Sequence, residues 1–509
     1  MSAKHRSDRG FGARLLGAMA CAGALGCSAG GSSNGTGEPP VGEPPVGAGG
    51  TAPSTPTSAG PAMPSAPPLN DDTIFDPGDL PASMDTGEGL PPAPRHRGLL
   101  DKQVTCDGDG KTTVSGTVYI PSGQLPLYNV MVYVPETELS PLTPGASCSC
   151  EISGEPIVSA LTDSSGRFVL ENVPVGPDIP LVIQVGDWRR EFNIGTVAAC
   201  TDTPVPDQTL RLPTKQSEGD LPRIAVATGA LDALECLVRK LGVDASEFTN
   251  PRDGGRVQLF TALDGTDRYS PLMNEGEIFP PAEALWNDVE SLKAYDIVLL
   301  SCEGDRDYVG NKPPEALQAM YDYANLGGRV FASHYHAVWF QNGPGEFPDI
   351  ATFTRENDRE YETITGDVVT DFPKGQAMAE WVVSSGTSAD GRVPIVGGAH
   401  TILQENTDYA QRWLQTTDPE SVQYISANTP FGASDADQCG RVVLSDLHVS
   451  PGVTDDAIGD LSGPGIEFPE GCTTEGLSPQ EAVLAFMLFD LSACIVPDSQ
   501  APVAPPIIR

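Results

Sequence analysis

The sequence predicts a multidomain protein in which a small antiparallel β-sandwich precedes an α/β domain with a mostly parallel sheet. Three observations support this fold class. Between residues 103 and 213, short apolar runs alternate with polar residues, which is typical of antiparallel strands. From residue 222 onward, apolar strands alternate with amphipathic helices, as in a parallel sheet covered on both faces. The chain of 509 residues is also too long for one ordinary domain.

Residues 1–27 have the pattern of a signal peptide. Basic residues such as Lys4 and Arg14 accompany an apolar run over residues 11–25 that contains no acid. This run is too short to cross a hydrocarbon core of roughly 30 Å, so we expect cleavage.

The end of this segment, Ala24-Leu25-Gly26-Cys27, resembles the bacterial lipobox. The resemblance implies lipidation at Cys27 and a membrane partner through the lipid anchor. Ala24 stands where the family usually has Leu, so ordinary secretory cleavage stays open. Ser28 rather than Asp at the next position implies an outer-membrane or cell-surface destination, with a periplasmic or secreted protein as the alternative.

Residues 28–95 consist largely of Gly, Pro, Ala, Ser and Thr, so too few apolar side chains are present to offset chain entropy. We predict a disordered linker there and a flexible tail over residues 496–509. The formal net charge of −39 excludes a nucleic-acid partner, because phosphates require clusters of Lys and Arg.

Nine cysteines follow Cys27, and an oxidising compartment would pair most of them. Four lie in the first folded region and five in the second, so one thiol of the second region is expected to stay free. Cys236 with Cys302 is one expected pair. The sequence has no CxxC pair, which argues against a structural zinc site.

The region over residues 103–213 carries a family resemblance. Val114–Val118 and the run from Thr162 to Phe168, followed by residues 172–176, resemble the carboxypeptidase regulatory-like domain. We expect residues 163–166 to form a hairpin turn, with Phe168 and Leu170 on one face. The resemblance implies a transthyretin-like sandwich that spaces, presents or binds and has no chemistry of its own.

The predicted α/β domain covers residues 222–495, and its order of elements is flavodoxin-like. The expected strands are residues 223–227, 257–261, 295–301, 329–333, 393–396, 422–427 and 441–445. The expected helices are residues 231–241, 282–293, 314–326 and 478–491.

Residues 295–301, the following helix and residues 327–334 resemble the core of the class I glutamine amidotransferase-like superfamily. That family has a nucleophilic Cys where this chain has His334, so thioester chemistry is excluded and the chain is not a glutamine amidotransferase. The ThuA-like branch, associated with trehalose utilisation, is closer because it also has a His at this elbow. Its C-terminal signature is matched by residues 440–448, which end in His448.

Ligands of open parallel sheets bind beyond the carboxyl ends of the strands. Several chemically capable side chains follow expected strands of this domain: Cys302 and Glu303, His334 and His336, His400, and Asp446 with His448. Two His and a carboxylate are the residue types that bind Zn or Fe, or that serve as acid and base near neutral pH.

Two classes of function follow from this rim, beside a purely architectural role in which these residues only support the fold. One is a binding or structural role, with carbohydrate or an envelope component as partner. The alternative is a metal-assisted hydrolase or sugar-modifying enzyme with a divalent metal on His334, His336 and His448. Glu303 or Asp446 would then be the base or orienting group. No GxGxxG or Walker motif is present, so no nucleotide cofactor is expected.

Overall fold

The computed structural model describes residues 96–150, 152–304, 310–354, 361–449, 463, 465–472 and 476–505. All of them belong to one compact unit that spans residues 88–509. The predicted signal peptide with Cys27, the whole linker over residues 28–95 and the last residues of the tail lie outside the described residues, so those expectations stay predictions. Within the described part of the chain, no helix has the length and apolar character needed to span a membrane.

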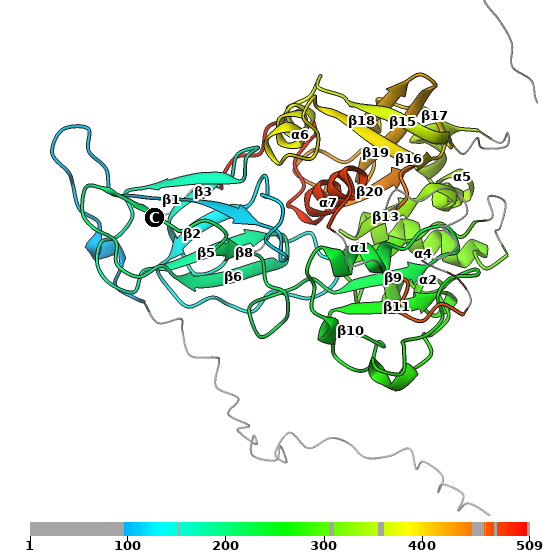
Figure 1. Cartoon of the computed structure of the whole chain (residues 1–509), viewed down its shortest axis with the longest axis horizontal. Coiled ribbons are helices and arrows are strands. Elements are labelled where there is room, and N and C mark those ends of the chain that lie inside the picture. The colour runs from blue at the N-terminus through cyan, green and yellow to red at the C-terminus, as the bar shows by residue number, and fades with distance from the viewer. Residues whose placement is uncertain are drawn as a thin grey trace, which may run out of the picture. The chain divides into compact units, whose positions relative to one another are not determined.

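Two four-stranded sheets form the first region (Figure 1). The first sheet has the order β4 (Arg167–Glu171), β1 (Thr113–Tyr119) and β7 (Asp202–Pro204), with β8 (Leu210–Arg211) also paired to β1. The second has the order β3 (Pro156–Leu161), β2 (Met131–Pro135), β5 (Pro180–Val185) and β6 (Trp188–Asn193). Side chains of both sheets, including Val114 and Val132, share one buried cluster.

The turn at residues 163–166 has the expected chemistry but not the expected role. Asp163 Oδ1 accepts the N–H groups of Ser165 and Arg167 at 2.8 and 3.0 Å, and Gly166 adopts φ +71°. The turn joins β3 to β4, which lie in different sheets, so the predicted hairpin is wrong. Phe168 and Leu170 of β4 are both buried and share one face of the strand, as expected.

A twelve-stranded sheet forms the second region, and it is mixed rather than mostly parallel. Its parallel half has the order β10 (Phe248–Thr249), β11 (Val257–Thr261), β9 (Ile224–Thr228), β12 (Ile297–Leu300), β13 (Arg329–Ser333) and β20 (Gly440–Ser445). Its antiparallel half continues with β19 (Glu420–Thr429), β18 (Ala410–Thr417), β15 (Tyr361–Val368) and β16 (Arg392–Gly398). The short strands β14 (Ala351–Phe353) and β17 (Ile402–Glu405) pair with each other, and β17 also pairs with β19.

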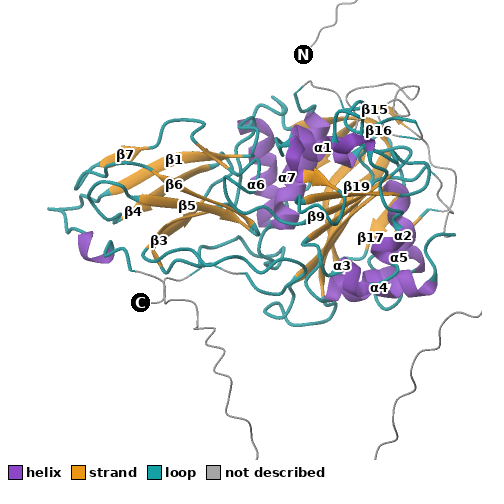
Figure 2. Cartoon of the chain, turned by 90° about the horizontal axis from the view of Figure 1, so that it is seen from below, coloured by secondary structure: helices purple, strands orange, loops and turns teal. Residues whose placement is uncertain are grey.

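Helices pack on both faces of this sheet (Figure 2). One face has α1 (Leu234–Lys240), α6 (Pro373–Ser384) and α7 (Pro479–Ser492), whose apolar side chains join the same cluster as the small sheets. The other face has α2 (Glu283–Trp286), α3 (Val289–Leu292), α4 (Pro314–Asn325) and α5 (Val338–Asn342). The expected helix over residues 282–293 is broken, because Asp288 is extended and its side chain caps α3 by accepting the Glu290 N–H.

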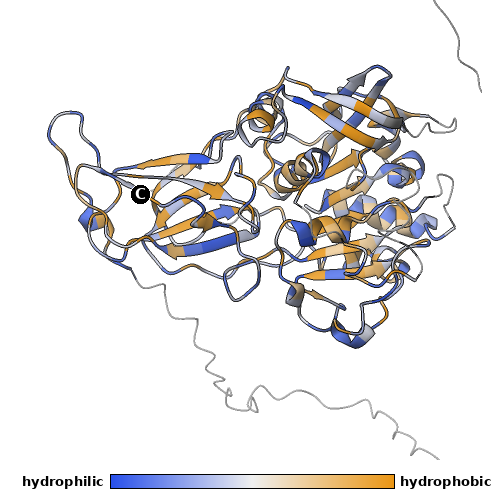
Figure 3. Ribbon diagram, viewed as in Figure 1, coloured by the Kyte–Doolittle hydropathy of each residue, from blue (hydrophilic) through white to orange (hydrophobic). Residues whose placement is uncertain are grey.

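Helix α7 links the two regions. It is buried from Gln480 to Ser492 and is apolar on most sides, as the hydropathy colours in Figure 3 show. Phe486 stacks on Tyr128 with ring centroids 6.0 Å apart, and Phe489 meets Trp188 at 5.6 Å. The sequence predicted this helix but not its contact with the first region.

Four disulfides are present among the described residues: Cys106–Cys200, Cys148–Cys439, Cys150–Cys494 and Cys236–Cys472. Two of them join the small sheets to the large-sheet region. The expected Cys236–Cys302 pair is wrong, and Cys302 is a free, buried thiol. The four disulfides are consistent with an exported protein.

Candidate metal centre

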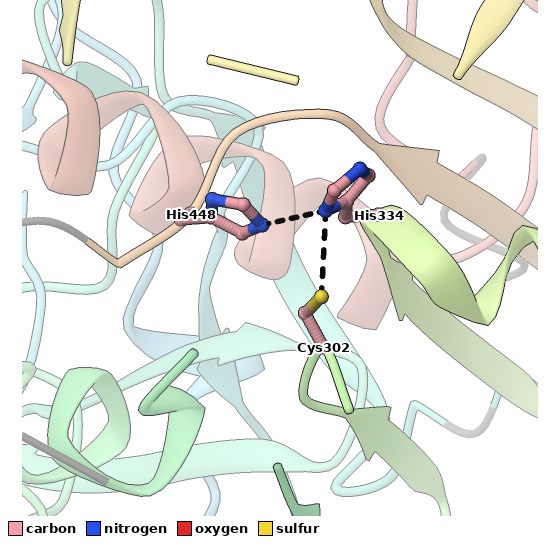
Figure 4. A group of neighbouring side chains, drawn as sticks. All are labelled: Cys302, His334 and His448. Carbon is pink, nitrogen blue, oxygen red and sulfur yellow. Dashed lines mark hydrogen bonds between the residues drawn. The ribbon is translucent and has the colours of Figure 1, made fainter. Parts of the chain in front are cut away.

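Three side chains meet beyond the carboxyl ends of three neighbouring strands (Figure 4). Cys302 follows β12, His334 follows β13, and His448 follows β20. These strands are parallel and adjacent in the sheet, so their carboxyl ends share one edge. The arrangement brings together residues that are up to 146 positions apart, from 302 to 448, in the sequence.

The distances within this cluster suit one metal ion. Cys302 Sγ lies 3.4 Å from His334 Nδ1, which lies 3.1 Å from His448 Nε2. One ligand atom from each residue lies within 4.8 Å of the other two. A tetrahedral zinc ion, with bonds of about 2.3 Å to sulfur and about 2.0 Å to nitrogen, separates sulfur from nitrogen by roughly 3.5 Å and two nitrogens by roughly 3.3 Å.

His334 has an unusual backbone conformation. It directly follows β13 and begins the short 3-10 helix His334–Ala337, with φ +45°. Positive φ is uncommon for a residue other than glycine, and such positions gather at functional sites. Its ring stacks on Tyr335 with centroids 3.7 Å apart, so both its backbone and its side chain are fixed.

A backbone carbonyl fixes the tautomer of His448. Its Nδ1 lies 3.2 Å from the oxygen of Gly397, which can only accept, so Nδ1 carries the hydrogen. In the neutral ring Nε2 then carries no hydrogen, and its lone pair points toward His334. Metal-binding histidines commonly donate their second N–H to a carbonyl in this way.

Cys302 is fully buried, and burial raises the pKa of its thiol. The backbone N–H groups of Tyr335 and Gly304 hydrogen-bond to the sulfur and act in the opposite direction. Without a cation the residue is therefore a neutral thiol at pH 7, which is a poor nucleophile. A coordinated metal would deprotonate it.

Asp232, which was not among the residues expected from the sequence, follows the next strand of the same edge, β9. Its carboxylate accepts hydrogen bonds from Ser333 Oγ and, at 2.7 Å, from Val449 N, so it contacts residues beside both histidines. Burial raises the pKa of Asp232, and the nearby His448 opposes that shift. The expected helix over residues 231–241 included Asp232, whereas α1 begins only at Leu234 and leaves Asp232 in the loop after β9.

His336 lies apart from the cluster, although we expected it beside His334. Its Nε2 lies 2.8 Å from the oxygen of Ser301, and its Nδ1 accepts the Trp339 indole N–H at 2.9 Å. Both nitrogens are thus engaged within the fold. Burial lowers the pKa of His336 to about 4, so the ring is neutral at pH 7.

The two expected carboxylates also support the fold around the site. Glu303 forms a buried ion pair with Lys312. Burial acts to raise the pKa of Glu303, but the charge of Lys312 and the hydrogen bonds from Lys312 and Asn311 oppose it, and the net shift is downward. Asp446 Oδ2 accepts the N–H groups of Thr401 and Ile402 at 2.8 and 3.1 Å.

His400 lies in the antiparallel half, where its Nδ1 is 2.7 Å from Ser421 Oγ. Of the histidines that follow expected strands, only His334 and His448 therefore belong to the cluster. Among the described residues the cluster thus offers one thiol and two imidazoles, and three protein ligands are the number that catalytic zinc sites use.

Comparisons with known proteins give only distant likenesses. Neither a protein-family model nor a curated protein matches the chain. A proposed GMP synthase component from Thermoplasma acidophilum aligns with 10% identity over 53% of this chain and 92% of its own, at a TM-score of 0.28. A proposed ThuA-like protein from Bacteroides uniformis aligns with 11% identity over 53% of this chain and 91% of its own, at 0.26.

A third likeness is equally distant. A type II cohesin–X-dockerin complex from Acetivibrio cellulolyticus aligns with 19% identity over 26% of this chain and 85% of its own, at a TM-score of 0.15. Likenesses this distant say nothing about the function of the chain.

Proposed function

We propose that this chain is an exported, metal-dependent hydrolase. One divalent ion, which we propose is zinc, is held by Cys302, His334 and His448. The observation that supports this proposal is the convergence of one sulfur and two nitrogens from three adjacent parallel strands. A zinc ion with three protein ligands supplies a bound water of lowered pKa for hydrolysis.

The surrounding residues have distinct tasks in this proposal. The Gly397 carbonyl orients the ring of His448, and the fixed elbow at φ +45° orients His334. The N–H groups of Tyr335 and Gly304 stabilise the thiolate of Cys302. Asp232, through Ser333 and Val449, holds the segments that carry the two histidines.

A nucleophilic role for Cys302 without a metal is less well supported. The thiol is buried and neutral, and its neighbour His334 Nδ1 also faces His448 Nε2 at 3.1 Å. Because His448 Nε2 is an acceptor, His334 Nδ1 must donate its hydrogen to it and then has no lone pair with which to deprotonate Cys302. A shared cation satisfies all three atoms at once.

The remaining parts of the proposal rest on the sequence. The lipobox-like Cys27 supports a lipid anchor, and the regulatory-like motifs support a transthyretin-like sandwich that presents the α/β region. The ThuA-like motifs around His334 and His448 support a ThuA-like domain and suggest carbohydrate as the class of substrate.

The experiment is a metal analysis of the mature chain produced in an oxidising compartment. We expect about one zinc per chain after dialysis, and loss of this metal in a His334→Ala, His448→Ala variant that keeps its circular dichroism spectrum. His336→Gln is the matched control, since it changes an equally buried imidazole outside the cluster and should leave the metal in place. A folded wild-type chain that binds no divalent ion would refute the proposal.

A further inference from the structure

A cavity of about 640 Å³ lies well away from the cysteine–histidine cluster, at the edge of the large sheet. It is lined by β11, by the loop over residues 250–253, by residues 277–280 and by α2 and α3. Its volume is in the ordinary range of small-molecule sites.

The break between α2 and α3 accounts for the cavity. These helices have four residues each, where the sequence predicted one helix of twelve. Strand β10 pairs with β11 only through Phe248 and Thr249, and the outer edge of β11 is met again at Thr261, which bridges Pro281. Short helices over a short edge strand leave the space unfilled.

The floor of the cavity is apolar and well ordered by packing. Phe260, Phe279 and Leu285 line it and are at most 3% exposed. Tyr295 adds its phenol, which donates a hydrogen bond to Gln258. Such a floor would hold the hydrocarbon body of a ligand.

One charged side chain of the lining is only partly exposed. Arg223 is half-buried, whereas Arg252, Asp253 and Glu277 are exposed at the rim, where water screens them. Tyr295 lines the same cavity as Arg223, and burial raises the pKa of Tyr295 to about 12.

Arg223 is also available to a ligand. Its backbone is fixed, because its N–H donates to Asp296 Oδ2 at 2.6 Å and its carbonyl accepts from Asp296 N. Within the part of the chain that the structure describes, its guanidinium has no carboxylate partner, unlike that of Arg189, Arg412 or Arg441.

We infer that this cavity binds a small carboxylic acid with an apolar body. The carboxylate would meet Arg223 through paired N–H donors, the geometry in which a guanidinium binds a carboxylate best. The body would lie on Phe260 and Leu285. This site is separate from the proposed metal centre and does not depend on it.

The test uses 3-phenylpropionate as the probe, with the mature full chain and titration calorimetry. We expect saturable binding of the acid, and binding at least roughly tenfold weaker for the neutral 3-phenylpropan-1-ol, because a hydrogen bond to a charged group is lost. Equal binding of acid and alcohol, or no binding of the acid at millimolar concentration, would overturn the inference.

Two variants locate the site. Arg223→Gln should weaken acid binding roughly tenfold while leaving alcohol binding unchanged, and Arg239→Gln on α1 is the matched control. Ala284→Trp places an indole from an exposed position of α2 into the cavity and should abolish binding without disturbing the core. Acid binding that survives Ala284→Trp would show that the probe binds elsewhere.

Discussion

His334 Nδ1 lies 3.1 Å from His448 Nε2, although 114 residues separate the two in the sequence. The parallel pairing of β13 with β20, in which Ser333 is opposite Ser445, brings their carboxyl ends together. Cys302 approaches the same nitrogen from β12. The topology of the sheet thus creates a donor set that no local sequence motif contains.

The mature chain should contain one free thiol. Eight of the nine cysteines after residue 27 form disulfides, and Cys302 is free and buried. Alkylation of the mature chain in denaturant without reductant, followed by peptide mass spectrometry, should modify Cys302 alone, and the native chain should resist it. Modification of any second cysteine would contradict the disulfide pattern.

The disulfide between Cys150 and Cys494 should stabilise the contact between the small sheets and the large-sheet region. It closes a loop of 344 residues, so its removal increases the conformational entropy of the unfolded chain. We expect a Cys150→Ser, Cys494→Ser variant to lose about 2–5 kcal/mol of unfolding free energy. Urea unfolding measures the loss, and limited proteolysis should then cut between the regions. The Cys106→Ser, Cys200→Ser variant should not show this cut, because that bond lies within the first region.

Asp490 should be among the most sensitive acids of the core. Its carboxylate pairs with Lys374 at 2.8 Å and with Arg441 at 3.0 Å, and all three side chains are at most 5% exposed. Asp490→Asn leaves the buried Lys374 without its carboxylate and removes one of the two carboxylates that pair with Arg441, which keeps Asp498, so it should cost about 3–5 kcal/mol in urea unfolding. Asp367→Asn removes the partner of the exposed Arg392 and should cost at most about 1 kcal/mol. Equal losses would contradict this account.

The Asp490 contribution should also depend on pH. Burial acts to raise the pKa of Asp490, but Lys374 and Arg441 outweigh it and hold the pKa below the ordinary value of 3.8. An acid whose pKa is lower in the folded state than in the unfolded state stabilises the fold at pH values above its unfolded pKa. This stabilisation is lost as the pH falls through its folded pKa. The difference between wild type and Asp490→Asn should therefore be constant near neutrality and shrink below pH 3.8. A difference that grows on acidification would contradict the sign.

Glu235 should produce the opposite dependence. Burial raises its pKa to about 8, and among the described residues no hydrogen-bond partner is found for its Oε2. The folded state then keeps a proton that the unfolded state releases above the ordinary value of 4.5. Stability should fall as the pH rises from 4.5 to about 8, by at most about 1.4 kcal/mol per pH unit. Glu235→Gln should flatten the dependence of unfolding free energy on pH over this range. An unchanged slope in the variant would contradict the assignment to Glu235.

Much of the fold is predictable because local pattern and tertiary role agree. Strand β13 matches its expected range, and α7 begins one residue after its expected start, at a capping box formed by Ser478 and Glu481. Strand direction was not predictable. Strand β19 is buried at nine consecutive positions, the pattern of a parallel strand, yet it pairs antiparallel on both sides.

The candidate site was predicted only in part, because side-chain contacts depend on tertiary structure as strand direction does. The carboxyl-edge rule selected Cys302, His334 and His448, but it also selected Glu303, which follows Cys302 directly and pairs with Lys312 outside the cluster. Asp446 accepts hydrogen bonds from the N–H groups of Thr401 and Ile402, and these bonds depend on the path of a loop that the sequence does not reveal. Disulfide pairing depends on tertiary distances in the same way.

The most direct test of the central claim is the absorption spectrum of the mature chain after replacement of its metal by Co²⁺. Coordination by Cys302, His334 and His448 predicts visible bands of tetrahedral cobalt together with a near-ultraviolet band from thiolate to cobalt charge transfer. Cys302→Ser should lose the charge-transfer band, and His336→Gln should keep the full spectrum. A folded chain whose spectrum shows no thiolate band, or whose thiolate band survives Cys302→Ser, would contradict the proposed centre.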